Sequence, residues 1–66
     1  MKIIDIYKKY GKKGTENLNI NCLINQRSWG IKLEEDEIVA MAEDYVSQFH
    51  PNKTIEILRI STKEEG

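Results

Sequence analysis

The strongest constraint on the fold is a stretch in which apolar side chains recur at the period of an α-helix. Between residues 35 and 49 they fall at i, i+3, i+4, i+7, i+8 and i+11: Ile38, Met41, Ala42, Tyr45, Val46 and Phe49. This spacing forms one continuous stripe along a helix. The acidic residues 34–37 lie in the first turn, where negative charge complements the helix dipole. We expect a helix over residues 35–49, with Glu34 as its N-cap and with Pro51 preventing its continuation.

The segment after this helix has the composition and period of a β-strand. Residues 54–61 are rich in β-branched side chains that alternate with polar ones. The large apolar positions are Ile55, Ile57, Leu58 and Ile60. The last two fall on the opposite face to the first two, so either both faces of the strand are covered or the strand bends near Arg59. Residues 62–66 are expected to be frayed.

Two shorter runs before the helix also have the period of a strand. In residues 17–22 apolar side chains alternate with asparagines, and in residues 28–33 they alternate with serine, glycine and lysine. The apolar members are Leu18, Ile20 and Cys22 in the first run and Trp29, Ile31 and Leu33 in the second. The polar residues 25–28 are about as long as a hairpin loop. We therefore expect the two runs to pair as an antiparallel hairpin.

The N-terminal segment fits two structures. Its apolar residues match the helical spacing i, i+3, i+4 and i+7: Ile3, Ile6, Tyr7 and Tyr10. The residue types, however, favour β-structure. We expect a short helix that ends at Gly11, with two lysines in its last turn. The alternative is a strand over residues 3–10 that turns at residues 11–14 and pairs with residues 17–24.

Together these elements predict one α+β domain over residues 1–66. It consists of a small antiparallel three-stranded sheet with one long amphipathic helix on one face. The expected order is α-β-β-α-β, and β-β-β-α-β is the alternative if residues 3–10 form a strand. One helix covers one face of such a sheet, so the other face must be solvated or must meet a partner. A chain of 66 residues has a thin margin of stability, because it buries little apolar surface.

Charge is divided between the two halves of the chain. Residues 1–33 hold seven lysines and arginines against two acidic residues, whereas residues 34–66 hold three against nine. The total net charge is only −1. A one-sided distribution of charge selects partners, but it does not determine a fold.

The cysteine and histidine content limits the classes of site. The single cysteine, Cys22, excludes an internal disulfide and fits a reducing compartment, so we expect a cytoplasmic protein. The one histidine, His50, has no partner at metal-ligand spacing. No apolar run approaches the roughly 20 residues that span a bilayer. We expect no metal, no cofactor and no membrane association. The many isoleucines, lysines and asparagines suggest an A+T-rich genome, and hence a bacterial or phage protein.

No group of residues predicts catalysis. Nucleophilic catalysis by Cys22 would require His50 within hydrogen-bond reach, and nothing in the sequence implies that contact. Because Cys22 alternates with the apolar residues of its run, we expect a buried, inert thiol. The acidic residues 34–37 fan out around a helix instead of converging on one point, so they fit the start of a helix better than an acid-base pair or a cation site. We expect that the protein is not an enzyme.

The densest cluster of positive charge, residues 7–14, is interleaved with two aromatic residues, Tyr7 and Tyr10. Nucleic-acid binders use lysines to neutralise phosphates and aromatic rings to stack on bases. If residues 3–10 form a helix, however, Tyr7 and Tyr10 lie on its buried stripe and the lysines form a solvated cap. Nucleic-acid binding is therefore the alternative function. Its phosphate contacts would be Lys8, Lys9, Lys12, Lys13, Arg27 and Lys32.

Trp29 lies beside the proposed hairpin turn. A lone tryptophan in a small domain is usually its largest core side chain, and its alternation with Ile31 and Leu33 favours burial. If Trp29 is instead exposed next to Arg27, the pair would form an anchor for a partner, since both residue types are enriched in binding hot spots. Exposure distinguishes the two interpretations.

The leading functional hypothesis is a non-enzymatic protein-interaction module. Such a protein would be a small regulatory or inhibitory factor that binds a partner protein, with homodimer formation as one form of this binding. The apolar content of the strands exceeds what one helix can cover, so an open sheet face or an edge strand is the expected contact surface. The expected partner-binding residues are Trp29, Arg27, Ile55 and Ile57. Nucleic-acid binding is less well supported, because the total charge is negative.

Overall fold

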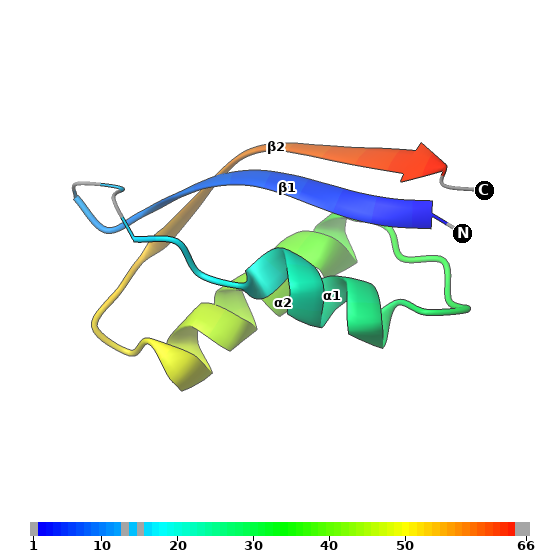
Figure 1. Ribbon diagram of the computed structural model, residues 1–66. Coiled ribbons are helices and arrows are strands. Elements are labelled where there is room, and N and C mark those ends of the chain that lie inside the picture. The colour runs from blue at the N-terminus through cyan, green and yellow to red at the C-terminus, as the bar shows by residue number, and fades with distance from the viewer. Residues whose placement is uncertain (1, 13, 15, 65–66) are drawn as a thin grey trace.

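The computed structural model describes residues 2–12, 14 and 16–64. Its elements, in chain order, are β1 (Lys2–Tyr10), α1 (Ile20–Arg27), α2 (Glu35–Phe49) and β2 (Ile55–Glu64). The two strands pair antiparallel, so the first and last elements of the chain form one two-stranded sheet. Figure 1 shows both helices on the same side of this sheet. The α+β class is confirmed, but the order is β-α-α-β, and the expected third strand is not formed by the described residues.

The N-terminal segment is a strand, so the expected helix over residues 3–10 is wrong. Alternate side chains of β1 point toward the helices, and Ile4, Ile6 and Tyr10 are buried. The strand alternative is correct in type but wrong in its pairing, because β1 pairs with the C-terminal strand. Gly11 ends the strand instead of a helix: it has a φ of 56°, and its N–H donates to the C=O of Thr54 (2.8 Å).

The expected hairpin of residues 17–22 and 28–33 is also wrong. Helix α1 occupies residues 20–27, and the residues that follow form the loop to α2. The buried side chains of α1, Ile20 and Ile24, are four residues apart, which is the spacing of one helix face. The same residues satisfy a short period-2 pattern, and short apolar runs do not distinguish a helix from a strand by period alone.

Asn25 closes the free edge of β1. Its Oδ1 accepts a hydrogen bond from the N–H of Ile4 (2.7 Å), and its Nδ2 donates to the C=O of Ile4 (2.9 Å). One turn earlier, Asn21 Nδ2 donates to the carboxylate of Asp5 (3.1 Å), and Asn21 Oδ1 accepts from Lys8 Nζ (2.6 Å). The asparagines of α1 therefore satisfy strand-edge groups that a third strand would otherwise occupy.

Helix α2 occupies residues 35–49, as the sequence predicts. Glu34 is its N-cap in extended backbone, although its side chain makes no capping bond, and the N–H of His50 donates to the C=O of Val46 (2.8 Å). Phe49, the last residue of the predicted stripe, is exposed. The core of the described residues comprises Ile4, Ile6, Tyr10, Leu18, Ile20, Ile24, Ile38, Ala42 and Val46.

A β-bulge in β2 resolves the conflict between its two apolar faces. Pairing with β1 is regular as far as Arg59 and then shifts, so that Leu58 is the extra residue. The bulge brings Ile57 and Ile60 onto the same face. Both pack against the border of the core, whereas Leu58 is exposed. Of the two alternatives that the sequence left open, the irregularity near Arg59 is the one observed. The strand continues to Glu64, three residues beyond the expected end of the strand at residue 61, and residues 65–66 lie outside the described residues.

The sheet face that points away from the helices is largely polar. Its cross-strand pairs are Ile3 with Lys63, Asp5 with Ser61, Tyr7 with Arg59, and Lys9 with Glu56. The guanidinium carbon of Arg59 lies 4.0 Å from the centroid of the Tyr7 ring, a cation–π contact. Because α1 and α2 together cover the apolar face, the surplus of apolar surface expected for one helix does not arise on the sheet.

The edge contact by Asn25 gives a test of the fold. Asn25→Ala removes both hydrogen bonds to the backbone of Ile4, and we expect the free energy of unfolding to fall by about 2 kcal/mol, because a part-buried donor and acceptor lose their partner. Urea denaturation followed by far-UV circular dichroism measures this change.

Gln26→Ala is the matched control, because Gln26 is exposed on the same helix. Its side chain makes one weak contact, to the Sγ of Cys22 (3.8 Å). We expect a change within about 0.5 kcal/mol. Equal effects of the two substitutions would show that helix propensity, and not the edge contact, dominates.

Candidate protein-binding groove

A tight turn follows α1. The N–H of Ser28 donates to the C=O of Ile24 (2.9 Å), which ends the helix, and the N–H of Ile31 donates to the C=O of Ser28 (2.9 Å), which closes a β-turn. Gly30 is the third residue of this turn and has a φ of 78°. The third position of a type II turn requires this conformation, and glycine adopts it without strain. Trp29 is the second residue, at the corner of the turn, from which a side chain projects out of the fold.

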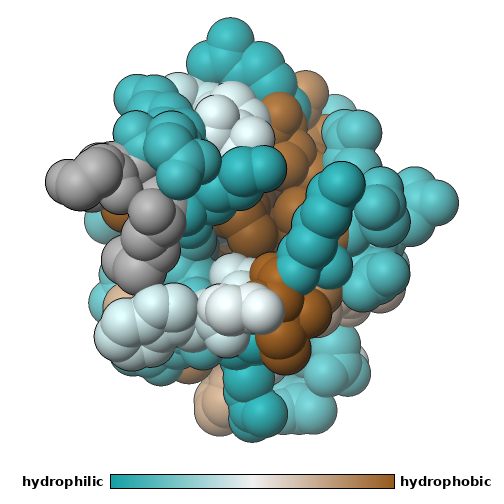
Figure 2. All heavy atoms as spheres, turned by 90° about the vertical axis from the view of Figure 1, so that its right-hand side faces the viewer, coloured by the Kyte–Doolittle hydropathy of each residue, from teal (hydrophilic) through white to brown (hydrophobic). Residues whose placement is uncertain are grey.

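A groove of about 890 Å³ lies beside this turn. We call it the terminal groove, because it lies at the end of the molecule where β1 begins and β2 ends (Figure 1). Its walls come from the start of β1, from α1, from the loop before α2 and from Thr62 of β2. Its apolar lining residues are Ile3, Ile4, Trp29, Ile31 and Leu33. Figure 2 shows apolar side chains at the centre of this end face, bordered by hydrophilic ones.

The two apolar side chains of the turn are largely exposed. Trp29 is 73% exposed and Ile31 is 62% exposed. The expected burial of Trp29 in the core is therefore wrong, because the corner of the turn directs the indole outward. Single exposed apolar residues are common on protein surfaces, but a contiguous patch that borders a groove is typical of an interaction site.

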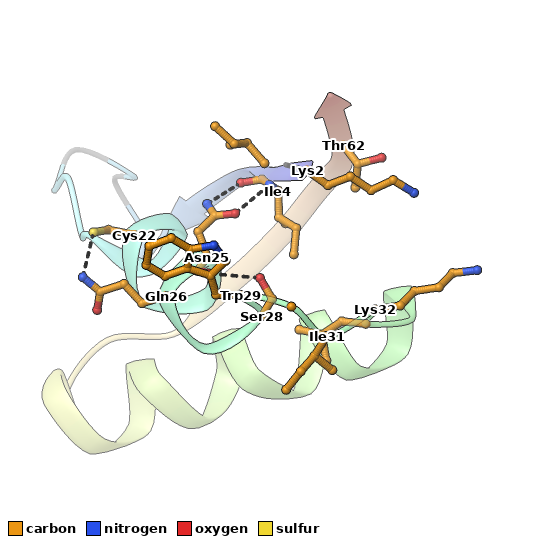
Figure 3. Close-up of a pocket in the computed structure, with 13 residues that line it drawn as sticks. Lys2, Ile4, Cys22, Asn25, Gln26, Ser28, Trp29, Ile31, Lys32 and Thr62 are labelled. Carbon is orange, nitrogen blue, oxygen red and sulfur yellow. Dashed lines mark hydrogen bonds between the residues drawn. The ribbon is translucent and has the colours of Figure 1, made fainter. Parts of the chain in front are cut away.

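The charged residues that line the terminal groove are Lys2 and Lys32, and no carboxylate lines it among the described residues. In Figure 3 both lysine side chains extend outward at one side of the groove, whereas the Trp29 ring lies at the other side. Two carboxylates lie nearby without lining the groove: Glu64 is opposite Lys2 in the ladder, and Glu34 follows Leu33 in the chain. The groove therefore has an apolar wall and a basic wall.

Cys22 also lines the terminal groove. Its thiol is exposed, so the expected burial of Cys22 is wrong. His50 lies in the wall of a smaller pocket of about 280 Å³, together with Leu18 and Phe49. The two residues line different pockets, and no hydrogen bond joins Cys22 and His50 among the described residues, so the pairing that nucleophilic catalysis would require is not formed.

The remaining residues expected to bind a partner lie in three different environments. Arg27 is exposed at the last turn of α1 and does not line the terminal groove. Ile55 and Ile57 are half-buried and pack against the core from β2. Of the four residues expected from the sequence, Trp29 alone belongs to the terminal groove.

The basic residues expected to contact phosphates do not gather on one surface. Lys12 lies in the turn after β1 and Lys32 in the loop before α2, at opposite ends of a molecule that is 36 Å long (Figure 1). Lys9 is on the outer sheet face, and Arg27 is on α1. The remaining member, Lys13, lies outside the described residues.

Lys8 is occupied within the fold. Its ammonium donates to the Oδ1 of Asn21 (2.6 Å) and to the C=O of Ile6 (3.2 Å), and it lies 5.8 Å from the centroid of the Tyr10 ring. Burial lowers the pKa of Lys8 from its usual value, and nearby Asp5 offsets part of this effect. Lys8 therefore belongs to the contact between β1 and α1, and Tyr10 is buried in the core instead of presenting a stacking surface.

No cluster of three or more histidine, cysteine or carboxylate side chains with the geometry of a metal site occurs among the described residues. In the same part of the chain, no helix has the length and apolar composition needed to cross a bilayer.

The lining residues Lys2, Ile3 and Ile31 were not among the residues that the sequence singled out for protein binding. A signal for the site was present, because glycine at position 30 fits the third position of a type II turn. Such a turn would have placed Trp29 at a corner. The competing alternation of Trp29, Ile31 and Leu33 favoured a strand instead.

Comparison of this chain with protein-family models, with curated proteins and with solved structures found no match.

Tyr10 gives a prediction about alkaline pH. Burial raises the pKa of Tyr10 to about 12, above its ordinary value of 10.0. Between these pH values the folded protein holds a proton that the unfolded chain loses. The stability contributed by neutral Tyr10 is therefore complete below pH 10 and decreases as the pH rises toward about 12. Denaturation curves measured across this range should show the decrease.

Tyr10→Phe is the matched control for this pH effect. It removes the hydrogen bond from the Tyr10 hydroxyl to the C=O of Leu18 (3.2 Å), at a cost of about 1 kcal/mol near neutral pH. The difference in stability between the wild type and Tyr10→Phe should shrink as the pH rises above 10. A difference that stays constant to about pH 12 would contradict the raised pKa.

Proposed function

We propose that this protein is a non-enzymatic protein-interaction module that binds a segment of a partner protein in the terminal groove. The observation that supports the proposal is the exposure of Trp29 and Ile31 beside a groove of about 890 Å³. Tryptophan is among the residues most enriched in binding hot spots, where it fills a pocket of the partner or forms the wall of one. The terminal groove therefore replaces the sheet face and Ile55 or Ile57 as the proposed contact surface.

The local structure supports this function because the apolar wall is held in place before binding. The turn that carries Trp29 is closed by the hydrogen bond from Ile31 to Ser28 (2.9 Å), and α1 and α2 fix its two ends. The hydroxyl of Ser28 also donates to the C=O of Asn25 (3.2 Å), the residue that ties α1 to β1. A preformed site loses less conformational entropy on binding than a flexible loop does.

Nucleic-acid binding is the weaker proposal. Its expected phosphate contacts are distributed over both ends of the molecule, and Lys8 is held by Asn21 and Ile6. Lysines that are dispersed in this way do not produce the continuous basic surface that follows a phosphate backbone.

Selection of binding peptides tests the proposed function without assuming a partner. A random library of short peptides displayed on phage would be selected on the wild-type protein and counter-selected on Trp29→Ala. We expect peptides that need Trp29, with affinity lower by about 30-fold in the variant, because a central aromatic anchor contributes about 2 kcal/mol. Trp29 is the only tryptophan, so its fluorescence should shift to shorter wavelength on binding.

Phe49→Ala is the matched control, because Phe49 is an exposed aromatic residue (59%) at the opposite end of the molecule. A bound peptide should also slow alkylation of the only cysteine, Cys22, which lines the terminal groove. Absence of any peptide that distinguishes Trp29→Ala from Phe49→Ala would refute the proposed site.

A second candidate function, self-association, is favoured by the open edge of β2. The N–H and C=O of Ile4 point away from β2, since both bond to Asn25. Residues directly opposite each other in an antiparallel ladder share the direction of these groups, so the N–H and C=O of Thr62, the partner of Ile4, point away from β1. No hydrogen bond from the other described segments reaches them. A second copy of the chain could pair along this edge.

Thr62→Pro tests this pairing, because proline removes an N–H that points outward and leaves the ladder with β1 intact. We expect light scattering to show a wild-type mass that rises toward a dimer with concentration, and a Thr62→Pro protein that stays monomeric with an unchanged circular dichroism spectrum. Trp29→Ala should still dimerise. A wild-type protein that is monomeric at about millimolar concentration, where weak complexes form, would exclude self-association.

A further inference from the structure

We propose that the segment bound in the terminal groove is acidic as well as apolar: a peptide in which a large apolar side chain is flanked by carboxylates. This inference rests on the proposed function and names the chemistry of the partner. It follows from the division of the terminal groove into an apolar wall and a basic wall.

The apolar wall determines the first requirement. Trp29 and Ile31 are exposed on the same turn, and Ile3 and Leu33 complete the lining. Contact with an aromatic or branched aliphatic side chain would remove this surface from water, which is the main favourable contribution in most protein association. A wholly polar segment would leave the indole of Trp29 uncovered.

The basic wall determines the second requirement. Lys2 and Lys32 are the charged lining residues, and their side chains extend on the same side of the groove (Figure 3). Glu64 lies opposite Lys2 in the ladder and Glu34 lies two residues after Lys32, so each carboxylate offsets part of the charge of one lysine. A carboxylate of the partner would meet a positive field here, whereas a lysine or arginine would meet like charge.

The arrangement also explains how a chain with a net charge of −1 can attract an acidic segment. The acidic residues of α2 begin at Glu35, outside the groove lining, and its other carboxylates follow along the helix. At physiological salt, charges separated by more than about 8 Å are largely screened, so the carboxylates farther along α2 contribute little at the bound segment, whereas Glu34 and Glu64 lie near the groove and offset part of the attraction of the two lysines.

Charge reversal tests the inference on the peptides selected above. Among peptides that require Trp29, we expect aspartate and glutamate to be enriched beside an aromatic or aliphatic residue. Lys2→Glu/Lys32→Glu should weaken the binding of such a peptide by roughly tenfold at low salt and by much less at about 0.5 M salt, because exposed charge pairs are screened. The double variant should also prefer a matched peptide with lysines in place of the carboxylates.

Lys12→Glu is the control, since Lys12 is exposed at the opposite end of the molecule. It changes the net charge in the same direction and should leave the affinity within about twofold, because its distance exceeds the screening length. The acidic partner would be overturned if the Trp29-dependent peptides were neutral or basic. It would also be overturned if Lys12→Glu and Lys2→Glu/Lys32→Glu weakened binding equally. Either result would leave the proposed function standing. Loss of all Trp29 dependence would overturn both. A preference for DNA or RNA oligonucleotides over every peptide would also overturn the inference.

Discussion

The structure depends on the pairing of the two ends of the chain. β1 and β2 are the first and last elements, and their ladder runs from Lys2 opposite Glu64 to Tyr10 opposite Ile55. Both helices lie between them in sequence, and both pack on one face of the two-stranded sheet. A two-stranded ribbon alone is marginally stable in water, so the sheet requires these helices as much as the helices require the sheet. The closing contacts span nearly the whole chain, and their loop-closure entropy must be offset by the core.

The contact between α1 and β1 explains why a third strand is not needed at the edge of β1. The side-chain amide of Asn25 offers an acceptor and a donor to the backbone of Ile4, as a neighbouring strand would. Lys8 and Asn21 extend the same contact by one turn of helix. Because these polar groups are satisfied locally, α1 can lie along the edge of β1 and still bury Ile20 and Ile24 in the core. The free edge of β2 has no comparable cover among the described residues.

The sequence was informative where period and chemical type agreed. For residues 35–49 the apolar stripe, the acidic start and Pro51 all indicated a helix, and α2 has the expected bounds. The C-terminal strand was also predicted, although the sequence did not decide between a strand covered on both faces and one that bends near Arg59. The errors fell on short segments whose period matched two structures. Residues 17–22 alternate like a strand, but Asn21 in this run makes an edge contact with β1, and such a tertiary role is invisible without knowledge of β1. For the site, the sequence identified Trp29 but expected its burial.

The formation of α1 in place of a strand limits the sheet to two strands and also creates the terminal groove. A hairpin over residues 17–33 would have placed Trp29 on a strand, packed against a helix. In the observed fold α1 ends at Arg27, and the chain must reverse within a few residues to begin α2 at Glu35. The tight turn closed by Ile31 and Ser28 makes this reversal and leaves the indole at its corner. At this position Trp29 exposes apolar surface to water, in a small domain whose free energy of unfolding is expected to be low. Burial of the same surface against a partner would contribute favourable free energy.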